Sequence, residues 1–358
     1  MEKIINKPKY NVQSQLLLLL LDKQQPRRVK LLINLLKGKR TVATLYWSLR
    51  YDLLGFLGAG KYFRVTNLSF KELINLGLIV KTTDGNSYFL TSKGAAEKNI
   101  LLKQIKEYPW QLNLQKFNLN KFKERLLLLI QVISEKDHNE RKYYPINVSE
   151  SEKFFVKNIL RNLSNDSLLK FKSQLSLFLK KINNAKIADI VANEFVGFDN
   201  NGYTIEQISA ELNLNEIVTK IYECYGFGLL AESFSQESDL NFLTFGLKNH
   251  LVSESSAKTF NYFLKVKDPV LVSQKRNLKL STIYEHLLEI AIFLPVTKFP
   301  YQYFFDYQLI NKVTESMDAN IDNWDYDQLE SSLKNKVPFY KFRLIEIYQT
   351  KSKDGMDK

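Results

Sequence analysis

The stretch GFLGAGKYF, which begins at Gly55, has the glycine and lysine spacing of a phosphate-binding loop. Four residues separate Gly55 from Gly60, and Lys61 follows directly. In such a loop the backbone amides and the lysine bind phosphate, and a Ser or Thr after the lysine holds magnesium. This chain has Tyr62 there, and the preceding residues follow helical rather than strand spacing. We therefore interpret the stretch as a turn after a helix, with Lys61 and Arg64 available to a nucleic-acid backbone.

Side chains that could form other catalytic or metal sites are scarce. The three histidines and the single cysteine lie far apart: His138, His250, His286 and Cys224. Their separation gives no metal-ligand spacing, and no nucleophile motif accompanies any of them. We therefore expect no enzyme activity, no metal, no cofactor and no small-molecule substrate.

Composition indicates a folded, helical, multi-domain protein. The 358 residues are 45% hydrophobic and include only 13 Gly and 8 Pro, which favours helices and allows two or three domains. A single cysteine excludes an intramolecular disulfide. The apolar runs fall short of the ~18 residues that span a bilayer, and the first residues lack the pattern of a signal peptide. We therefore expect a soluble, cytoplasmic protein without a membrane partner.

The net charge of +13 is concentrated near the N-terminus. Residues 1–110 contain 19 basic and 7 acidic residues, whereas residues 199–250 contain 2 basic and 8 acidic residues. A concentrated positive field attracts polyanions, nucleic acid before acidic membrane. General solubility is the alternative explanation of the charge.

The first predicted domain, residues 1–110, is basic and winged-helix-like. Helical spacing predicts a helix after Pro26 and another over 42–58, and a capping box at Ser69-x-x-Glu72 opens a third. The stripe expected to be buried in the second helix consists of Leu45, Leu49, Leu53 and Phe56. Two strand candidates follow, joined by a turn at Asp84-Gly85-Asn86, and then another helix. Helices followed by a hairpin are typical of a winged helix-turn-helix, and the segment LTSKG after the hairpin resembles that family.

The densest basic spot in this domain is the turn KGKRT between the first two helices. A solvated turn is one interpretation, and binding of phosphate near a helix N-terminus is the other. The candidate DNA-binding residues here are Lys37, Lys39, Arg40, Thr41 and Arg50, in addition to Lys61 and Arg64.

Two further segments precede the C-terminal domain. Residues 111–198 form a predicted helical middle domain with a polar connection within it. Residues 199–250 form an acidic helical segment, in which Thr204-x-x-Gln207 caps a helix. Because the basic second helix of a DNA-binding pair is missing, we interpret this segment as packing or as a surface for a protein partner.

Residues 251–358 are predicted to form a helix-turn-helix domain. A helix ends near Asp268-Pro269, a short second helix follows, and a third helix begins at Ser281 or Thr282 as its cap. The inward residues of the third helix are Ile283, Leu287, Ile290 and Leu294. Its N-terminal end would contact base edges, and the preceding basic residues would contact phosphates. The candidate DNA-binding residues are Lys275, Arg276, Lys279, Ser281, Thr282, Tyr284 and His286.

Two segments carry a resemblance to a known family. LLKGKRTVATLYWSLRYDLLGFLG resembles the N-terminal part of the YpbB-like proteins of low-GC Gram-positive bacteria. LKLSTIYEHLLEIAIF resembles their C-terminal helix-turn-helix module, which also occurs in some RecQ-type helicases. The resemblance implies a detached accessory part of a helicase, with DNA and a RecQ-type helicase as partners.

The sequence therefore predicts a mainly α, multi-domain helical protein with an N-terminal winged-helix-like domain and a C-terminal helix-turn-helix domain. The leading functional hypothesis is a non-enzymatic DNA-binding protein that works with a RecQ-type helicase in repair or replication. One alternative is a sequence-specific transcriptional regulator that binds an operator as a dimer. A second is a structural adaptor whose helices bind only protein.

Overall fold

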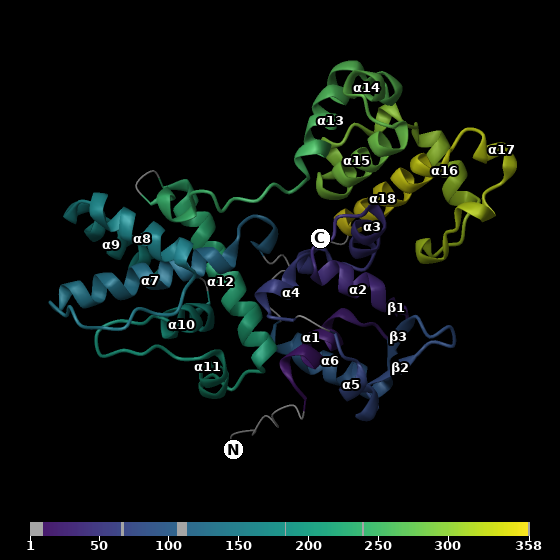
Figure 1. Cartoon of the computed structure of the whole chain (residues 1–358). Helices are drawn as coiled ribbons and strands as arrows, with labels where there is room; N and C mark the ends of the chain where they lie inside the picture. The colour runs from purple at the N-terminus through teal and green to yellow at the C-terminus, as the bar shows by residue number, and fades with distance from the viewer. Residues whose placement is uncertain (1–9, 66–67, 106–112, 183, 238–239, 357–358) are drawn as a thin grey trace. The chain divides into compact units, whose positions relative to one another are not determined.

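The computed structural model of the protein describes residues 10–65, 68–105, 113–182, 184–237 and 240–356, and it is mainly helical (Figure 1). Within those residues, the regular β structure consists of one small three-stranded sheet. The predicted fold class, a mainly α protein of several domains, is confirmed.

The chain forms two compact units that do not follow its order in sequence. Unit 1 comprises Met1–Gly38 and Gly55–Asn249, and unit 2 comprises Lys39–Leu54 and His250–Lys358. This division differs from the four predicted segments, because a short N-terminal stretch groups with the C-terminal helices rather than with its neighbours in sequence.

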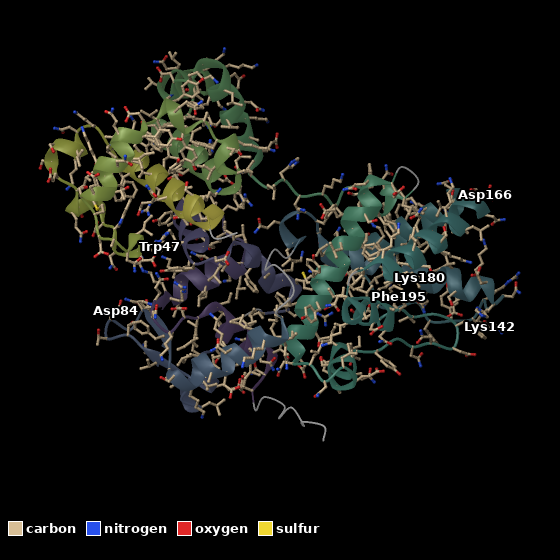
Figure 2. The ribbon with its side chains drawn as sticks, turned by 180° about the vertical axis from the view of Figure 1, so that it is seen from behind. Trp47, Asp84, Lys142, Asp166, Lys180 and Phe195 are labelled. Carbon is tan, nitrogen blue, oxygen red and sulfur yellow. The ribbon has the colours of Figure 1, made fainter. Side chains whose placement is uncertain are left out.

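The N-terminal part of unit 1 contains the predicted hairpin and three of the predicted helices, those after Pro26, after Ser69 and after the hairpin, whereas the helix predicted over 42–58 lies in unit 2. The elements of this part of unit 1 are α1 (Val12–Leu20), β1 (Arg27–Arg28), α2 (Val29–Leu36), α4 (Ala59–Tyr62), α5 (Lys71–Asn75), β2 (Ile79–Lys81), β3 (Ser87–Leu90) and α6 (Ser92–Gln104). The strands are antiparallel in the order β1-β3-β2, with Arg27 opposite Tyr88 and Ile79 opposite Leu90. Asp84 lies at the tip of the β2–β3 hairpin, beside Gly85 with its φ of +72° (Figure 2).

The predicted capping box at Ser69-x-x-Glu72 is wrong. Helix α5 begins only at Lys71 and has no side-chain cap. The Glu72 carboxylate instead accepts hydrogen bonds from the hydroxyl of Ser14 at 2.5 Å and from the backbone amide of Asn11. Glu72 therefore ties α5 to the start of α1, a long-range contact that local spacing does not reveal.

The glycine-rich stretch after Gly55 forms a tight turn. A 3-10 turn over Leu54–Phe56 leads to Gly58, whose φ of +81° is left-handed and therefore suits glycine. A Cβ at Gly60 would lie 2.8 Å from the carbonyl oxygen of Leu36, so the close approach of α4 to α2 requires glycine there. Helix α3 and the 3-10 turn, rather than a strand, lead directly into this stretch, and α4 has only four residues. The stretch therefore lacks the strand and long helix of a phosphate-binding loop.

The rest of unit 1 is a group of helices around one buried helix (Figure 1). Its elements are α7 (Leu119–Asp137), α8 (Glu150–Asn162), α9 (Asn165–Lys181), α10 (Ala185–Asn193), α11 (Ile205–Glu211) and α12 (Glu216–Gln236). The capping box predicted at Thr204 and Gln207 is present at the start of α11. Helix α12 is buried over most of its length and packs against α1, α7, α10 and α11, so it forms the core.

Unit 2 combines α3 (Val42–Arg50) with the C-terminal helices. These are α13 (Glu254–Val266), α14 (Pro269–Arg276), α15 (Leu280–Phe293), α16 (Tyr307–Glu315), α17 (Ser331–Lys334) and α18 (Phe339–Met356). Helix α15 contacts α3, α13, α14 and α18 and is therefore the centre of the unit.

The helix predicted over 42–58 is shorter than expected. Helix α3 ends at Arg50, and Asp52 then adopts a left-handed φ of +52°. The predicted stripe is split as a result, because Leu45 is buried in unit 2 whereas Phe56 is buried in unit 1. Helical spacing alone does not show where the chain passes from one unit to the other.

Candidate nucleic-acid interface

Helices α13, α14 and α15 form the predicted three-helix arrangement. Asn277 ends α14 with a left-handed φ of +50°, and the turn then leads directly into α15. Phe263, Val272 and Ile283, one from each helix, are fully buried. The predicted inward face of α15 is confirmed for Ile283, Leu287 and Ile290, whereas Leu294 is half-buried just beyond the helix end.

The N-terminal end of α15 differs from the prediction in its cap. Lys279 is the residue before the helix and makes no side-chain cap, so Ser281 and Thr282 lie inside the first turn. The first backbone amides of α15 therefore have no side-chain acceptor at this end, where the helix dipole favours an anion.

Exposed basic side chains surround this end of α15. Lys275 and Lys279 are exposed, and the Lys275 ammonium lies 5.7 Å from the ring centre of Tyr262. Ser281 is exposed and Thr282 half-buried. The structure thus places four predicted DNA-binding residues between the last turn of α14 and the first turn of α15.

Three other predicted residues are engaged in packing within the unit. The guanidinium of Arg276 donates to the carbonyl oxygen of Ser255 at 2.7 Å and to the hydroxyl of Thr259. Thr259 also contacts the ring of His286 at 2.7 Å. Burial lowers the pKa of His286, and the positive charge of Arg276 adds to this. The ring of Tyr284 stacks on Tyr340 of α18, with centres 3.6 Å apart. Arg276, Tyr284 and His286 therefore hold α13, α14, α15 and α18 together.

Arg40 is anchored to α15 rather than directed to solvent. Its guanidinium donates to the Glu289 carboxylate at 2.8 Å and to the carbonyl oxygen of Leu251, and it lies over the ring of Phe293. Ser253 donates to the same carboxylate through its backbone amide and its hydroxyl. Although burial opposes it, hydrogen bonds from the hydroxyl of Ser256, the backbone amide of Ser253 and Arg40 lower the pKa of Glu289 and keep it charged.

Arg50 is buried, with 6% of its side chain exposed. Its guanidinium binds the carboxylate of Asp322 and donates to the hydroxyl of Thr350 at 2.7 Å. Arg50 was predicted to contact phosphate, but its guanidinium is already paired inside unit 2.

The remaining predicted residues of the basic turn are divided between the units. Lys37 is exposed at the end of α2 in unit 1, whereas Lys39 is exposed in unit 2. Thr41 caps α3 by accepting a hydrogen bond from the backbone amide of Thr44. Because Arg40 binds Glu289, this turn lies about 15 Å along α15 from Lys279. Lys39 and Lys279 therefore belong to separate basic surfaces.

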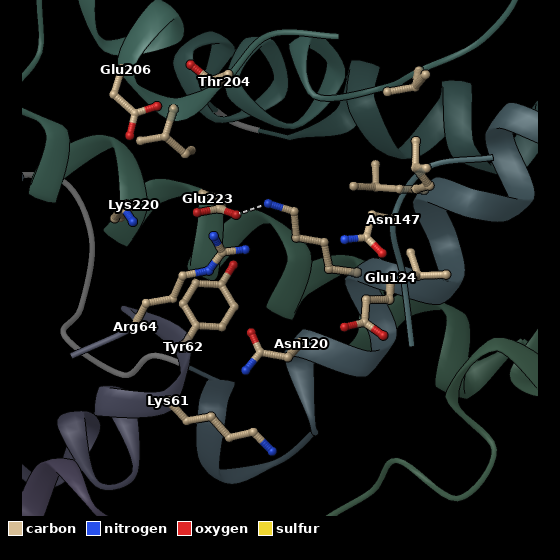
Figure 3. A pocket seen from close by; sticks show the side chains of 16 residues that line it. Lys61, Tyr62, Arg64, Asn120, Glu124, Asn147, Thr204, Glu206, Lys220 and Glu223 are labelled. Carbon is tan, nitrogen blue, oxygen red and sulfur yellow. Dashed lines mark hydrogen bonds and ion pairs between the residues drawn. The ribbon is translucent and has the colours of Figure 1, made fainter. Parts of the chain in front are cut away.

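Lys61 and Arg64 line a pocket in unit 1 (Figure 3). The pocket also contains residues that the sequence did not single out, among them Asn120, Asn147 and Lys220. No local signal identifies them, because they come from α7, the connection before α8, and α12. The fold alone brings them together.

The described part of the chain lacks both a metal-binding cluster and a membrane-spanning helix. No group of three or more His, Cys, Asp or Glu residues there could hold a metal ion. Among the same residues, no helix is both long and apolar enough to cross a membrane.

Comparison with known proteins supports the assignment of the C-terminal helices. Residues 255–346 match the helix-turn-helix domain family. Unit 2 therefore carries a helix-turn-helix domain. The match includes α13 to α15 and extends into α18, whereas α3 lies outside it.

The chain is also similar to a protein over most of its length. It is 25% identical over 334 residues to Protein YpbB of Bacillus subtilis (strain 168), a match that covers 90% of this chain and 92% of that protein. No solved structure matches the chain. The resemblance to YpbB-like proteins, inferred from two short segments, thus extends over nearly the whole chain.

Proposed function

We propose that this chain is a non-enzymatic DNA-binding protein that holds duplex or junction DNA for a RecQ-type helicase. The observation that carries the DNA-binding part is the exposed basic end of α15 within a helix-turn-helix domain. Lys275 and Lys279 bind phosphates on either side of the groove entrance, and Ser281 and Thr282 lie nearest to the bases.

The helicase part of the proposal is supported by resemblance. The segments over 35–58 and 278–293 resemble YpbB-like proteins, and the similarity to Protein YpbB spans 90% of the chain. A resemblance of that extent supports an accessory role, in which the helicase hydrolyses ATP and this chain holds the DNA. Binding would then depend mostly on charge and little on sequence.

The DNA-binding part is tested by reversing two charges. The double variant Lys275→Glu/Lys279→Glu should bind a short duplex at least about tenfold more weakly at low salt. Its affinity should also depend less steeply on salt concentration, because about two phosphate contacts are lost. Fluorescence anisotropy measures both. The matched control, Lys312→Glu/Lys336→Glu, changes two exposed lysines elsewhere in unit 2 and should leave affinity unchanged. Equal losses in the two variants would contradict a specific interface on α15.

The helicase part is tested by unwinding. Adding this chain to a RecQ-type helicase should raise the rate of unwinding of a forked duplex, and the Lys275→Glu/Lys279→Glu variant should not. An unchanged rate with the parent chain would refute the partnership while leaving DNA binding intact. A footprint at one promoter, with a preference of ~10³ or more over random DNA, would instead identify a transcriptional regulator.

A further inference from the structure

Unit 1 contains a pocket of about 660 Å³ that the helix-turn-helix does not involve (Figure 3). Its walls come from α4, the N-terminal half of α7, the connection before α8, the start of α11 and the N-terminal half of α12. The volume falls within the range of small-molecule sites.

The carboxylates around this pocket are engaged by the protein itself. Glu124 accepts hydrogen bonds from Ser149, at 3.1 Å from the backbone amide and at 2.6 Å from the hydroxyl. Glu223 is paired with the ammonium of Lys123. A hydrogen bond from its own backbone amide lowers the pKa of Glu206, and the hydroxyl of Thr204 and the positive charges of Lys220 and Arg64 add to this, so that this carboxylate is ionised. No carboxylate of the lining therefore lacks a positive or donating partner.

The cations of the rim are paired less closely, because the charge of Glu206 acts on Arg64 and Lys220 without forming an ion pair. The side chains of Lys61, Arg64 and Lys220 make no hydrogen bond or ion pair with any residue the structure describes. The side-chain amides of Asn120 and Asn147 likewise have no partner among those residues, and they face the interior of the pocket (Figure 3). The site thus offers three basic side chains and two amides that have no hydrogen bond or ion pair among the described residues, and the charge of Glu206 offsets part of the charge of Arg64 and Lys220.

We propose that this pocket binds a phosphate ester of nucleotide size. A phosphate carries up to two negative charges and several acceptor oxygens, which match Arg64 and Lys220 on one side and Lys61 on the other. The amides of Asn120 and Asn147 bind the hydroxyl or base groups of the same ligand. The phosphate ester belongs either to a free nucleotide or to the phosphorylated 5′ end of a nucleic-acid strand.

Binding of AMP to the full chain tests the proposal. Calorimetry at low salt should detect AMP with a dissociation constant below about 1 mM. The double variant Arg64→Gln/Lys220→Gln should weaken binding at least about tenfold, because each substitution removes a charge-assisted contact. The control Lys186→Gln, an exposed lysine of α10 outside the pocket, should bind AMP as the parent does. Unchanged melting temperatures in both variants would show that the fold is intact.

A second arm distinguishes the two sources of phosphate. If strand ends are the ligand, a 5′-phosphorylated oligonucleotide should bind more tightly than its 5′-hydroxyl form, and the pocket variant should abolish that difference. If AMP binds and the two oligonucleotides bind equally, the ligand is a free nucleotide. The proposal is overturned if neither AMP nor the 5′-phosphate is recognised, or if the pocket variant binds as the parent does. The Lys275→Glu/Lys279→Glu variant should retain AMP binding, so failure here is distinguishable from failure of the helix-turn-helix interface.

Discussion

Buried carboxylates fix the positions of basic side chains in both units. In unit 2, Glu289 holds Arg40 and the start of α13, and Glu346 accepts a hydrogen bond from Tyr46 at 2.7 Å. In unit 1, Lys123 bridges two glutamates. An arginine that is paired in this way contributes to folding and is not available to DNA, so residue type alone does not identify an interface residue.

Arg50 gives the clearest stability prediction at this scale. Arg50→Met should lower the free energy of unfolding by about 2 to 4 kcal/mol, because it leaves Asp322 without its partner in a mostly buried site. Urea denaturation measures the change. Lys39→Met, which removes an exposed charge, should change stability by less than about 0.5 kcal/mol. A stable Arg50→Met protein with impaired DNA binding would show instead that Arg50 contacts phosphate.

Glu194 gives a pH prediction. Burial raises the pKa of Glu194 from 4.5 to about 8, and repulsion by Glu223, which shares Lys123 with it, adds to the shift. The folded protein thus binds this proton more tightly than the unfolded chain does. The contribution of this proton to the free energy of unfolding is fully present below about pH 4.5 and is lost as the pH rises through about 8.

Glu194→Gln keeps this side chain neutral at every pH. The variant should match the parent near pH 5 and should exceed its stability at pH 9 by about 1 to 2 kcal/mol. Thermal unfolding across that range measures the difference. Glu211→Gln, an exposed position on α11, should follow the parent throughout. A Glu194→Gln protein that loses stability equally at both pH values would contradict the shared-lysine arrangement.

At the scale of elements, close backbone approaches decide where helices can lie. In the stretch after Gly55, Gly60 allows α4 to lie close to the backbone of α2. A similarly close backbone contact requires a glycine in α6. A Cβ at Gly94 would lie 1.9 Å from the carbonyl oxygen of Leu78, next to the start of β2. A glycine inside a helix normally lowers its stability, so its presence here reflects the contact and not the helix.

Gly94→Ala should therefore destabilise the protein by about 2 kcal/mol, despite the higher helix propensity of alanine. Ala96 is exposed on the same helix, so Ala96→Gly tests helix propensity alone. This substitution should lower the free energy of unfolding by about 0.5 to 1 kcal/mol. Both are measured by urea denaturation. An unchanged or raised stability of Gly94→Ala would show that α6 can move away from the sheet.

At the scale of the whole molecule, the chain enters unit 2 twice. Residues 39–54 contribute α3, and Arg40, Tyr46 and Arg50 from this segment each bind an acidic residue of the C-terminal part. The helix-turn-helix match begins only at residue 255, so a domain boundary drawn from that match omits α3. The complete unit requires segments about 200 residues apart in sequence.

A fragment of residues 250–358 should accordingly be much less stable than unit 2 in the full chain, because three acidic residues each lose one partner. A synthetic peptide of residues 39–54 should raise the melting temperature of the fragment in a concentration-dependent way. The same peptide with Arg40, Tyr46 and Arg50 changed to alanine should have no effect. A fragment that is fully stable alone would contradict the role of α3.

The sequence by itself determined the local features of this protein. Helical spacing and turn residues predicted the mainly α class, the β2–β3 hairpin, the cap of α11 and the three helices of the helix-turn-helix, because each depends on residues a few positions apart. Tertiary structure decided the contacts between distant segments. It placed α3 in unit 2, paired Arg40 and Arg50 with carboxylates over 200 residues away, and gathered Lys61, Arg64 and Lys220 around one pocket. Whether a charge is buried or paired depends on which surfaces the folded chain brings together, and the spacing of residues along the sequence does not predict those contacts.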